Sequence, residues 1–359
     1  MELALYCPVY GYYEKEGDTP GRQGDYFTSV SVGPLFGELL ALRFARWLEE
    51  MPGQNVGGPL EFQIVEAAAH DGRLAKDILR WLQVHRGDTF QKIVYWIVEP
   101  SERRRQWQRH SLAEFAGKVR WVHRLSELSS GGKRAVESRT GAKGSSGVRG
   151  VIFSNELLDA MPAHRFSWDA AKAKWFEWGV DWDAAGFRWT PLPGAPEKAV
   201  QVPGWPEAIL RHLPDGFTTE TCPAANQWWA EAAAILEAGK LITFDYGLTD
   251  EEYLAPERRE GTVRAYRRHQ VAANVLADPG DQDLTAHVNF SALSQVGEGA
   301  GLRTELLCSQ EEFLMGIATP VFRGEELFGE WTQERTAQFQ TLTHPGHLGR
   351  VFRVLVQSR

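Results

Sequence analysis

Two short apolar runs of the chain are followed by acidic residues, at places where a carboxylate could hold a ligand. Glu66 precedes the stretch AAAHDGRLA, in which Gly72 opens a helical pattern, and Glu99 ends the run KIVYWIVE. In nucleotide-binding α/β folds, a glycine-bearing turn after the first strand approaches the ligand, and an acid after the second strand accepts the ribose hydroxyls. A plain strand-to-helix turn and a solvated carboxylate explain the same residues, so the motif alone leaves both interpretations open.

A second group of candidates lies in SNELLDAMP, residues 154 to 162, which follows another apolar run. We expect Asn155, Glu156 and Asp159 at the carboxyl end of the sheet. If a helical turn begins there, Glu156 and Asp159 share a face by their i,i+3 spacing. Two carboxylates can hold a planar guanidinium and orient its nitrogen. Acids in the first turn of a helix, which stabilise its dipole, are the alternative.

The segment 21–48 places a glycine-rich turn and a Ser/Thr pair ahead of an amphipathic helix. Asp25, Thr28 and Ser29 could close over a ligand from this turn. A capped helix entry explains the Ser/Thr pair equally well.

Charge and the spacing of cysteines and histidines exclude several classes of function. The net charge is −8, and no basic face marks a nucleic-acid binder. Cys7, Cys222 and Cys308 lie far apart, which argues against a zinc knuckle, a redox pair or a disulfide framework and predicts a cytoplasmic setting. His269 and His287 lack metal-ligand spacing, so we expect no metal. We expect no membrane span and no signal peptide, because no apolar run is long enough and the start lacks a basic region.

The elements that must position these residues follow an alternating pattern from residue 60 onward. Short β-branched or aromatic runs alternate with longer amphipathic segments, which is typical of βαβ units around a parallel sheet. Strands are expected at 62–67, 92–100, 119–125, 150–157 and 239–247, and a terminal β pair at 302–309 and 350–357. Helices are expected at 72–85 and within 224–239, 310–318 and 328–342. A further helix is expected to begin after Ser101, with Ser101 as its N-cap. The pattern predicts a mostly parallel, doubly wound α/β sheet.

Several segments outside this alternation look like insertions in one domain spanning 1–359. Residues 129–150 are rich in Gly, Ser and basic residues, which predicts a flexible loop, with a basic docking arm as the alternative. Segments 164–216 and 248–290 are expected to form a cap. Within the first of them, 181–216 is rich in Pro and Trp and is expected to be irregular.

Eight sequence blocks together resemble the MidA family of S-adenosylmethionine-dependent methyltransferases. In the family's order they are ALYCPVYGYY, GDYFTSVSVGPLFGELLA, IVEPSERRRQWQ, SNELLDAMPAHRF, DYG, GTVRAYRRH, DLTAHVNFS and SQEEFLMGI, which cover nearly the whole chain. The resemblance implies a Rossmann-like class I methyltransferase core with a family-specific cap. It also implies S-adenosylmethionine bound around the first loop and Glu99, and methyl transfer to a protein arginine. Because mitochondrial members assist assembly of respiratory complex I, a respiratory complex subunit is an implied partner.

The chain departs from the family's pattern in the cofactor loop. Where the family resembles E-x-G-x-G-x-G-x-L, this sequence has Glu66, Ala68, His70, Gly72 and Leu74, so two glycines are replaced. If either position needs positive φ, a β-carbon there costs roughly 1–2 kcal/mol. The start also departs, because Met1 falls inside a segment resembling YMELALYDPEYGYY, and we expect a preceding helix to be missing.

Three hypotheses of different classes follow. The first is a methyltransferase whose cofactor is held by Glu66, Ala68, His70, Gly72 and Glu99, and whose substrate nitrogen is held by Asp25, Asn155, Glu156 and Asp159. The second is a catalytically silent member that binds a partner protein as an assembly factor. The third, a nicotinamide-dependent oxidoreductase, is disfavoured because its loop needs the same missing glycines.

Overall fold

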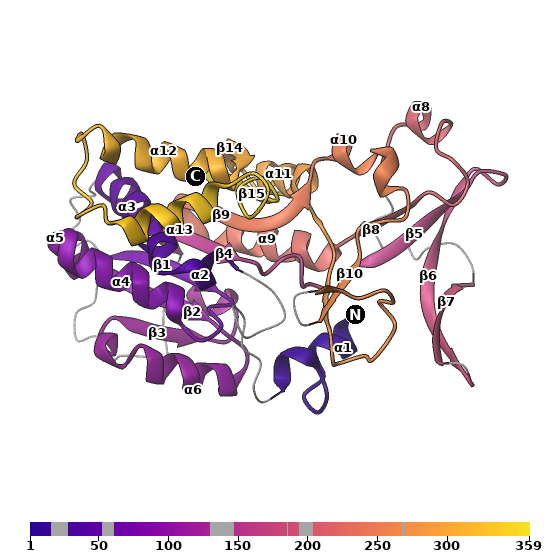
Figure 1. Cartoon of the computed structure of the whole chain (residues 1–359), viewed down its shortest axis with the longest axis horizontal. Helices are drawn as coiled ribbons and strands as arrows, with labels where there is room; N and C mark the ends of the chain where they lie inside the picture. Colours follow the sequence, from indigo (N-terminus) through magenta and orange to yellow (C-terminus); the bar gives the residue numbers. More distant parts are fainter. Residues whose placement is uncertain (16–27, 52–60, 130–146, 185, 194–203, 268–269) are drawn as a thin grey trace. The chain divides into compact units, whose positions relative to one another are not determined.

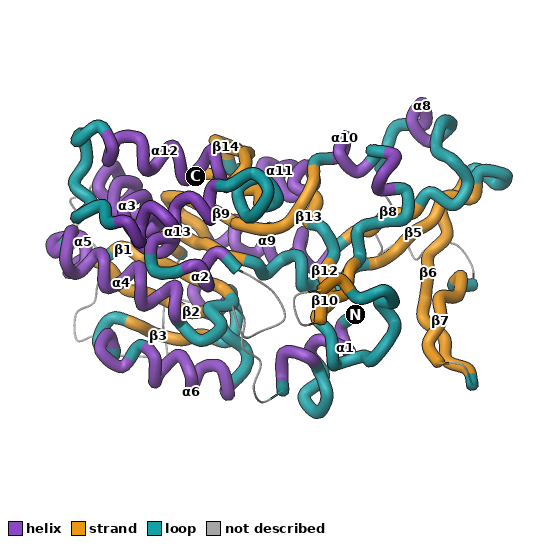
Figure 2. Tube along the Cα trace, in the orientation of Figure 1, coloured by secondary structure: helices purple, strands orange, loops and turns teal. Residues whose placement is uncertain are grey.

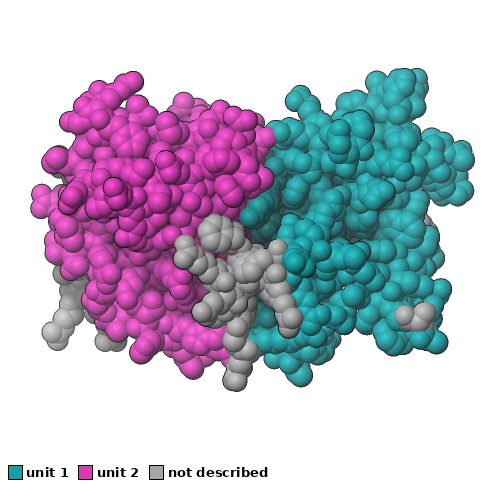
Figure 3. Space-filling view, in the orientation of Figure 1, with its two compact units in different colours: residues 1–27, 158–228, 246–293 teal, residues 28–157, 229–245, 294–359 magenta. Residues whose placement is uncertain are grey.

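The structure is a computed structural model that describes residues 1–15, 28–51, 61–129, 147–184, 186–193, 204–267 and 270–359. The chain folds into two compact units (Figure 3). Unit 1 comprises Met1–Phe27, Leu158–Trp228 and Tyr246–Leu293, and unit 2 comprises Thr28–Leu157, Trp229–Asp245 and Ser294–Arg359. One domain spanning 1–359 was expected, whereas the chain divides into two compact units. The segments expected to form a cap, 164–216 and 248–290, both belong to unit 1.

The core of unit 2 is a mostly parallel sheet with the strand order β14-β15-β9-β4-β1-β2-β3 (Figure 1). The neighbours β1/β2, β1/β4, β2/β3 and β4/β9 are parallel, and the terminal pair β14/β15 is antiparallel. The strands are β1 (Phe62–Ala67), β2 (Ile93–Val98), β3 (Val119–Val122), β4 (Val148–Asn155), β9 (Leu236–Leu248), β14 (Arg303–Ser309) and β15 (Phe352–Ser358). This arrangement confirms the predicted doubly wound α/β core and its terminal β pair.

Helices follow the strands as the amphipathic pattern predicts, because apolar residues spaced three and four apart share one helical face. Leu35, Leu39 and Leu42 are fully buried on one of these helices, and Leu74 and Ile78 are buried on the next. The helices are α2 (Ser29–Val32), α3 (Leu35–Glu50), α4 (Arg73–His85), α5 (Gly87–Lys92), α6 (Glu102–Ser111), α7 (Ser126–Ser129), α9 (Pro223–Ile235), α11 (Phe290–Gly299), α12 (Gln310–Phe322) and α13 (Gln333–Thr343), with a 3-10 turn at Ala113–Phe115.

Unit 1 contains two smaller sheets, with strand orders β7-β6-β5-β8 and β11-β10-β12 (Figure 2). Its elements are α1 (Glu2–Tyr6), η1 (Tyr12–Glu14), β5 (His164–Asp169), β6 (Lys174–Asp183), β7 (Gly186–Pro191), α8 (Glu207–Leu210), β8 (Thr218–Thr221), α10 (Asp250–Tyr253), η3 (Pro256–Arg258), β10 (Arg264–Arg267), β11 (Gln270–Val271), β12 (Asp283–Thr285) and β13 (Val288–Asn289). The expectation of an irregular segment at 181–216 is therefore wrong at β7 and α8. Phe166 and Trp168 of β5 and Trp175 of β6 form a buried aromatic cluster with Phe217. This cluster accounts for part of the aromatic content.

The expected flexible loop at 129–150 lies mostly outside the described residues. Its described ends belong to regular elements, because Ser129 ends α7 and β4 begins at Val148. Among the described residues, no helix combines the length and apolar character that crossing a membrane requires.

Candidate functional site

The loop that follows β1 has left-handed backbone at every second residue. Ala68, His70 and Gly72 have φ values of +61°, +44° and +82°. A residue with a β-carbon is disfavoured in this region by roughly 1–2 kcal/mol, whereas glycine is not. The two positions where this chain replaces the family's glycines therefore keep the backbone that glycine favours.

Glu66, near the end of β1, is buried and shares a hydrogen bond with a tyrosine. The Tyr95 hydroxyl donates to Glu66 Oε2 at 2.7 Å, and Glu66 is 2% exposed. Burial raises the pKa of Glu66 to about 8; the Tyr95 hydrogen bond opposes the rise, and the charges of Asp71 and Asp77 add to it. Around neutral pH this carboxyl therefore holds a proton in much of the unliganded protein.

Glu99 lies directly beside the loop, as the sequence predicts. Ala67 pairs with Val98 in the parallel register, and the Ala68 N–H faces the Val98 carbonyl at 3.4 Å. Glu99 is 2% exposed, and its Oε1 accepts a hydrogen bond from the Ser101 N–H at 2.9 Å. Ser101 does occupy the N-cap position of α6, but its side chain makes no capping hydrogen bond.

The other side of the loop is occupied by the end of β4. Ala67 pairs with Ser154 in parallel register, which places Asn155 and Glu156 at the same carboxyl edge. Asn155 Nδ2 donates to Glu156 Oε1 at 2.9 Å, and the Glu156 N–H donates to the Phe244 carbonyl at 2.9 Å. The residue directly after the strand is left-handed, since Glu156 has φ +53°.

No helix begins at Glu156, so the prediction that Glu156 and Asp159 share a helical face is wrong. The positive φ of Glu156 is incompatible with a right-handed helical turn, and bends and turns follow up to Ala160. Asp159 is a buried residue of unit 1 whose carbonyl accepts the Ala286 N–H at 2.9 Å. Asp25 lies outside the described residues.

The capped helix entry, rather than a ligand lid, accounts for the Ser/Thr pair of the 21–48 segment. Thr28 caps α2: its hydroxyl accepts the Ser31 N–H at 3.0 Å, and its own N–H donates to Ser31 Oγ at 3.1 Å. The hydroxyl of Ser29 donates to Gln310 Oε1 at 2.9 Å, within the core.

Two residues that contact the candidate site were not singled out from the sequence. Tyr95 pairs with Ile64 and so lies diagonally across from Glu66 on the same face of the sheet; a hydroxyl in an otherwise apolar strand was the available signal. Gln108 of α6 is fully buried, and its Nε2 lies 2.9 Å from the His70 carbonyl and 3.3 Å from Glu99 Oε2. Its burial was not visible in the highly charged helix ERRRQWQRHS.

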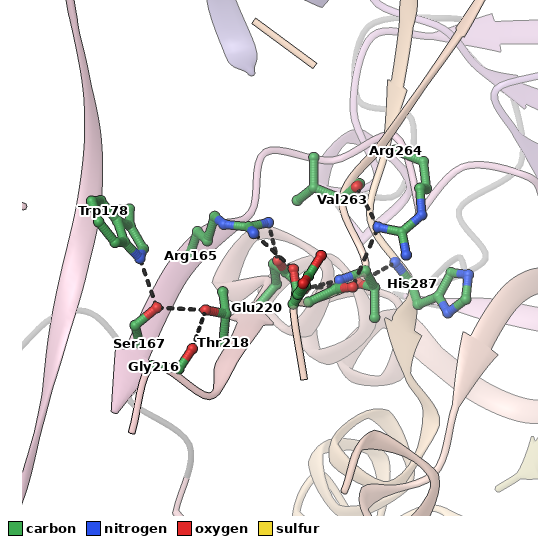
Figure 4. Close-up of polar contacts among 12 residues, drawn as sticks. Arg165, Ser167, Trp178, Gly216, Thr218, Glu220, Val263, Arg264 and His287 are labelled. Carbon is green, nitrogen blue, oxygen red and sulfur yellow. Dashed lines mark hydrogen bonds and ion pairs between the residues drawn. The ribbon is translucent and has the colours of Figure 1, made fainter. Parts of the chain in front are cut away.

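Unit 1 contains a separate buried polar cluster around the start of the block GTVRAYRRH (Figure 4). Glu220 is 2% exposed and accepts hydrogen bonds from the Thr262 N–H at 2.6 Å, the Thr262 hydroxyl at 2.9 Å and Arg165 Nη1 at 2.8 Å. The His287 N–H in turn donates to Thr262 Oγ1 at 3.1 Å. Glu220 therefore joins strands β5 and β8 to the segments that carry Thr262 and His287.

His287 belongs to this cluster and is held neutral. Burial, chiefly, and the positive charges of Arg258 and Arg264 together lower its pKa to about 4, against the opposing charge of Glu252. Arg258 Nη1 lies 3.4 Å from His287 Nδ1. The other histidine singled out from the sequence, His269, lies outside the described residues.

Comparison with known proteins agrees with this geometry. Residues 39–308 match the model of a family described as S-adenosyl-L-methionine-dependent methyltransferases. A crystal structure of a Burkholderia thailandensis protein bound to S-adenosyl-homocysteine superposes with a TM-score of 0.78 at 28% identity, covering 100% of this chain and 86% of that one.

Curated relatives are named protein arginine methyltransferase NDUFAF7, mitochondrial, or its homolog. The Drosophila melanogaster protein is 26% identical over 84% of this chain and 66% of its own length. The Xenopus tropicalis protein is 29% identical over 88% of this chain and 71% of its own length. The human protein is 27% identical over 83% of this chain and 64% of its own length. The chain thus spans about two thirds of the length of these relatives.

Proposed function

The chain belongs to this family of S-adenosyl-L-methionine-dependent methyltransferases, and we propose that it transfers the methyl group to an arginine side chain of a protein. The observation that carries the proposal is the carboxyl edge of the sheet, where the 66–72 loop lies between Glu99 and the Asn155–Glu156 pair. The names of the relatives support arginine as the acceptor. A protein substrate is the corresponding partner.

The residues present at this edge fit an adenosyl cofactor. Left-handed backbone at three loop positions makes a tight turn, which a close-lying ligand requires, and Glu99 stands where an acid accepts ribose hydroxyls. Glu66, Ala68, His70, Gly72 and Glu99 would hold the cofactor. When bound, S-adenosylmethionine supplies a methyl group on a positively charged sulfonium.

The acceptor side of the reaction needs a carboxylate. An arginine guanidinium has a pKa above about 12 and is a poor nucleophile until a carboxylate orients it and takes up the proton released when its nitrogen is methylated. Glu156, which Asn155 holds by a hydrogen bond of 2.9 Å, is our candidate for both tasks. Asp25 and Asp159 stay candidates from the sequence.

The test is a paired assay on Glu156→Gln. Glutamine keeps the carbonyl that Asn155 Nδ2 contacts but removes the charge, so we expect transfer to fall by about 100-fold or more while S-adenosylhomocysteine binding stays within about threefold. Binding is measured by calorimetry, and transfer by radiolabelled methylarginine released from proteins of a deletion-strain lysate. The exposed Glu127, changed to Gln, is the control and should leave both unchanged. Full transfer by Glu156→Gln would remove this residue from the mechanism.

A catalytically silent assembly factor is a second candidate, favoured by one observation. Ala68 and His70 carry side chains at left-handed positions of the loop, and His70 brings a ring to it. On this alternative the wild-type protein binds a partner but not S-adenosylhomocysteine. Calorimetry on the wild-type protein separates the two candidates.

Two further expectations stay predictions. One is that the acceptor is a respiratory complex subunit rather than a nucleic acid or a membrane component. The other is a cytoplasmic setting, with which the free thiols of Cys7, Cys222 and Cys308 agree.

A further inference from the structure

The side chain of Gln108 joins three elements of the candidate site. It is fully buried on α6, and its Nε2 donates to the His70 carbonyl at 2.9 Å and to Glu99 Oε2 at 3.3 Å. Its Oε1 accepts from Trp121 Nε1 at 2.9 Å. One amide therefore connects the loop after β1, the acid after β2 and a side chain of β3.

Trp121 settles which way the amide faces. An indole N–H can only donate, so the atom of Gln108 that faces Trp121 must be the carbonyl oxygen. The NH₂ group then faces His70 and Glu99, both of which present oxygen acceptors. The orientation of the amide follows from the chemistry of its three partners.

The His70 carbonyl belongs to the part of the loop that is strained. Ala68 and His70 have left-handed φ although each carries a β-carbon, which disfavours this backbone. A buried hydrogen bond stabilises the arrangement in which it forms, and more so when its partner is charged. A donor fixed on the His70 carbonyl therefore helps the loop to keep this disfavoured backbone.

We propose that Gln108 is a positioning residue for the cofactor, which holds the glycine-poor loop and the Glu99 carboxylate in one arrangement. This inference rests on the proposed function, in which the loop and Glu99 bind S-adenosylmethionine. Gln108 does not itself react. Its hydrogen bond to the His70 carbonyl stabilises a left-handed backbone that glycine adopts easily and that alanine and histidine do not. Its contribution is therefore larger in this chain than it is when glycines stand at positions 68 and 70.

The chain offers a matched control in Gln357 of β15. Gln357 is also fully buried, its Oε1 accepts from Trp229 Nε1 at 2.8 Å, and its Nε2 donates to the Ser294 carbonyl at 2.9 Å and to Thr304 Oγ1 at 2.8 Å. Its amide thus shares with that of Gln108 an indole N–H donor and a backbone carbonyl acceptor, while its third partner is a hydroxyl in place of a carboxylate. None of these partners lies in the loop or at Glu99. Loss of either amide should lower the melting temperature.

The experiment measures S-adenosylhomocysteine binding by calorimetry for Gln108→Met and Gln357→Met. Methionine keeps the length of the side chain and removes its hydrogen bonds. We expect Gln108→Met to raise the dissociation constant by about tenfold or more, and Gln357→Met to leave it within about twofold. In the Ala68→Gly, His70→Gly background, Gln108→Met should raise it by about threefold or less.

Three results would overturn the inference. If Gln108→Met binds S-adenosylhomocysteine with a dissociation constant within about twofold of the wild type, Gln108 has no positioning role. If Gln108→Met loses affinity by the same factor in the wild-type background and in the Ala68→Gly, His70→Gly background, its effect does not act through the loop. If Gln108→Met does not fold, Trp121→Phe decides, because it frees the amide to rotate while the ring stays; unchanged affinity overturns the inference. No binding by the wild type overturns the proposed function itself, which the variants alone cannot do.

Discussion

At the scale of single residues, the fold opposes the ionisation of Glu66. Its pKa is raised to about 8, chiefly by burial, whereas in an unfolded chain it is near 4.5. Between these values the folded protein retains a proton that the unfolded chain has lost, so the free energy of unfolding falls as the pH rises through this window. The full difference corresponds to at most about 5 kcal/mol.

Glu66→Gln should remove this dependence, because the amide resembles the protonated carboxyl and its oxygen can still accept from Tyr95. Urea unfolding at pH 5 and at pH 8 measures how far the free energy of unfolding falls over this range. We expect this fall to be smaller in Glu66→Gln than in the wild type by about 2 kcal/mol or more. The exposed Glu114, changed to Gln, is the control. Equal pH slopes for wild type and Glu66→Gln would show that Glu66 is ionised throughout.

The sequence predicts the strand-end residues well and their partners poorly. Glu66, Glu99 and Asn155 follow from apolar periodicity, because each apolar run locates a strand end. Tyr95 and Gln108 do not follow from it, since their contacts join elements that are distant in the sequence. The left-handed backbone at Ala68 and His70 was suggested only by the family's glycines, and no local preference of alanine or histidine predicts it.

At the scale of elements, helices α3 and α4 pack closely at Gly37. A β-carbon built there would lie 2.7 Å from the β-carbon of Asp77, which cannot swing away. Gly37→Ala gains up to about 1 kcal/mol of helix propensity but should lose more to overpacking, with a net cost of about 1–2 kcal/mol. Gly316 of α12 is the matched control, because nothing lies near its added methyl. Gly316→Ala should be neutral or stabilising by chemical denaturation, and a stabilised Gly37→Ala would mean that the two helices separate easily.

The elements themselves divide into those that the pattern predicts and those that it does not. Buried parallel strands such as β1 are nearly continuous apolar runs, so they stand out in the sequence. β6 and β7 are half-exposed and carry Pro and charged residues, for which alternation is weak. Segment 181–216 was therefore expected to be irregular, although it contributes a strand to a four-stranded antiparallel sheet.

At the scale of the whole molecule, the two units should respond to pH in opposite directions. Unit 2 holds Glu66, whose raised pKa makes that unit less stable as the pH rises. Unit 1 holds His287, whose pKa is lowered to about 4 by burial and by Arg258 and Arg264. Between about pH 6.5 and 4 the unfolded chain binds a proton that folded unit 1 excludes, so unit 1 loses stability as the pH falls.

The His287 effect can be isolated by His287→Asn, which keeps a polar side chain that cannot take up charge. We expect hydrogen exchange in β10 and β12 of the wild type, corrected for intrinsic rates, to show opening free energies that fall by up to about 3 kcal/mol between pH 6.5 and 4.5. In His287→Asn the fall should be smaller, while β1 and β2 behave as in the wild type. Because the backbone N–H of residue 287 still reaches Thr262, the Glu220 cluster is retained in the variant. An identical fall in both proteins would show that other groups cause the acid sensitivity, and His287 would then be charged in the folded protein.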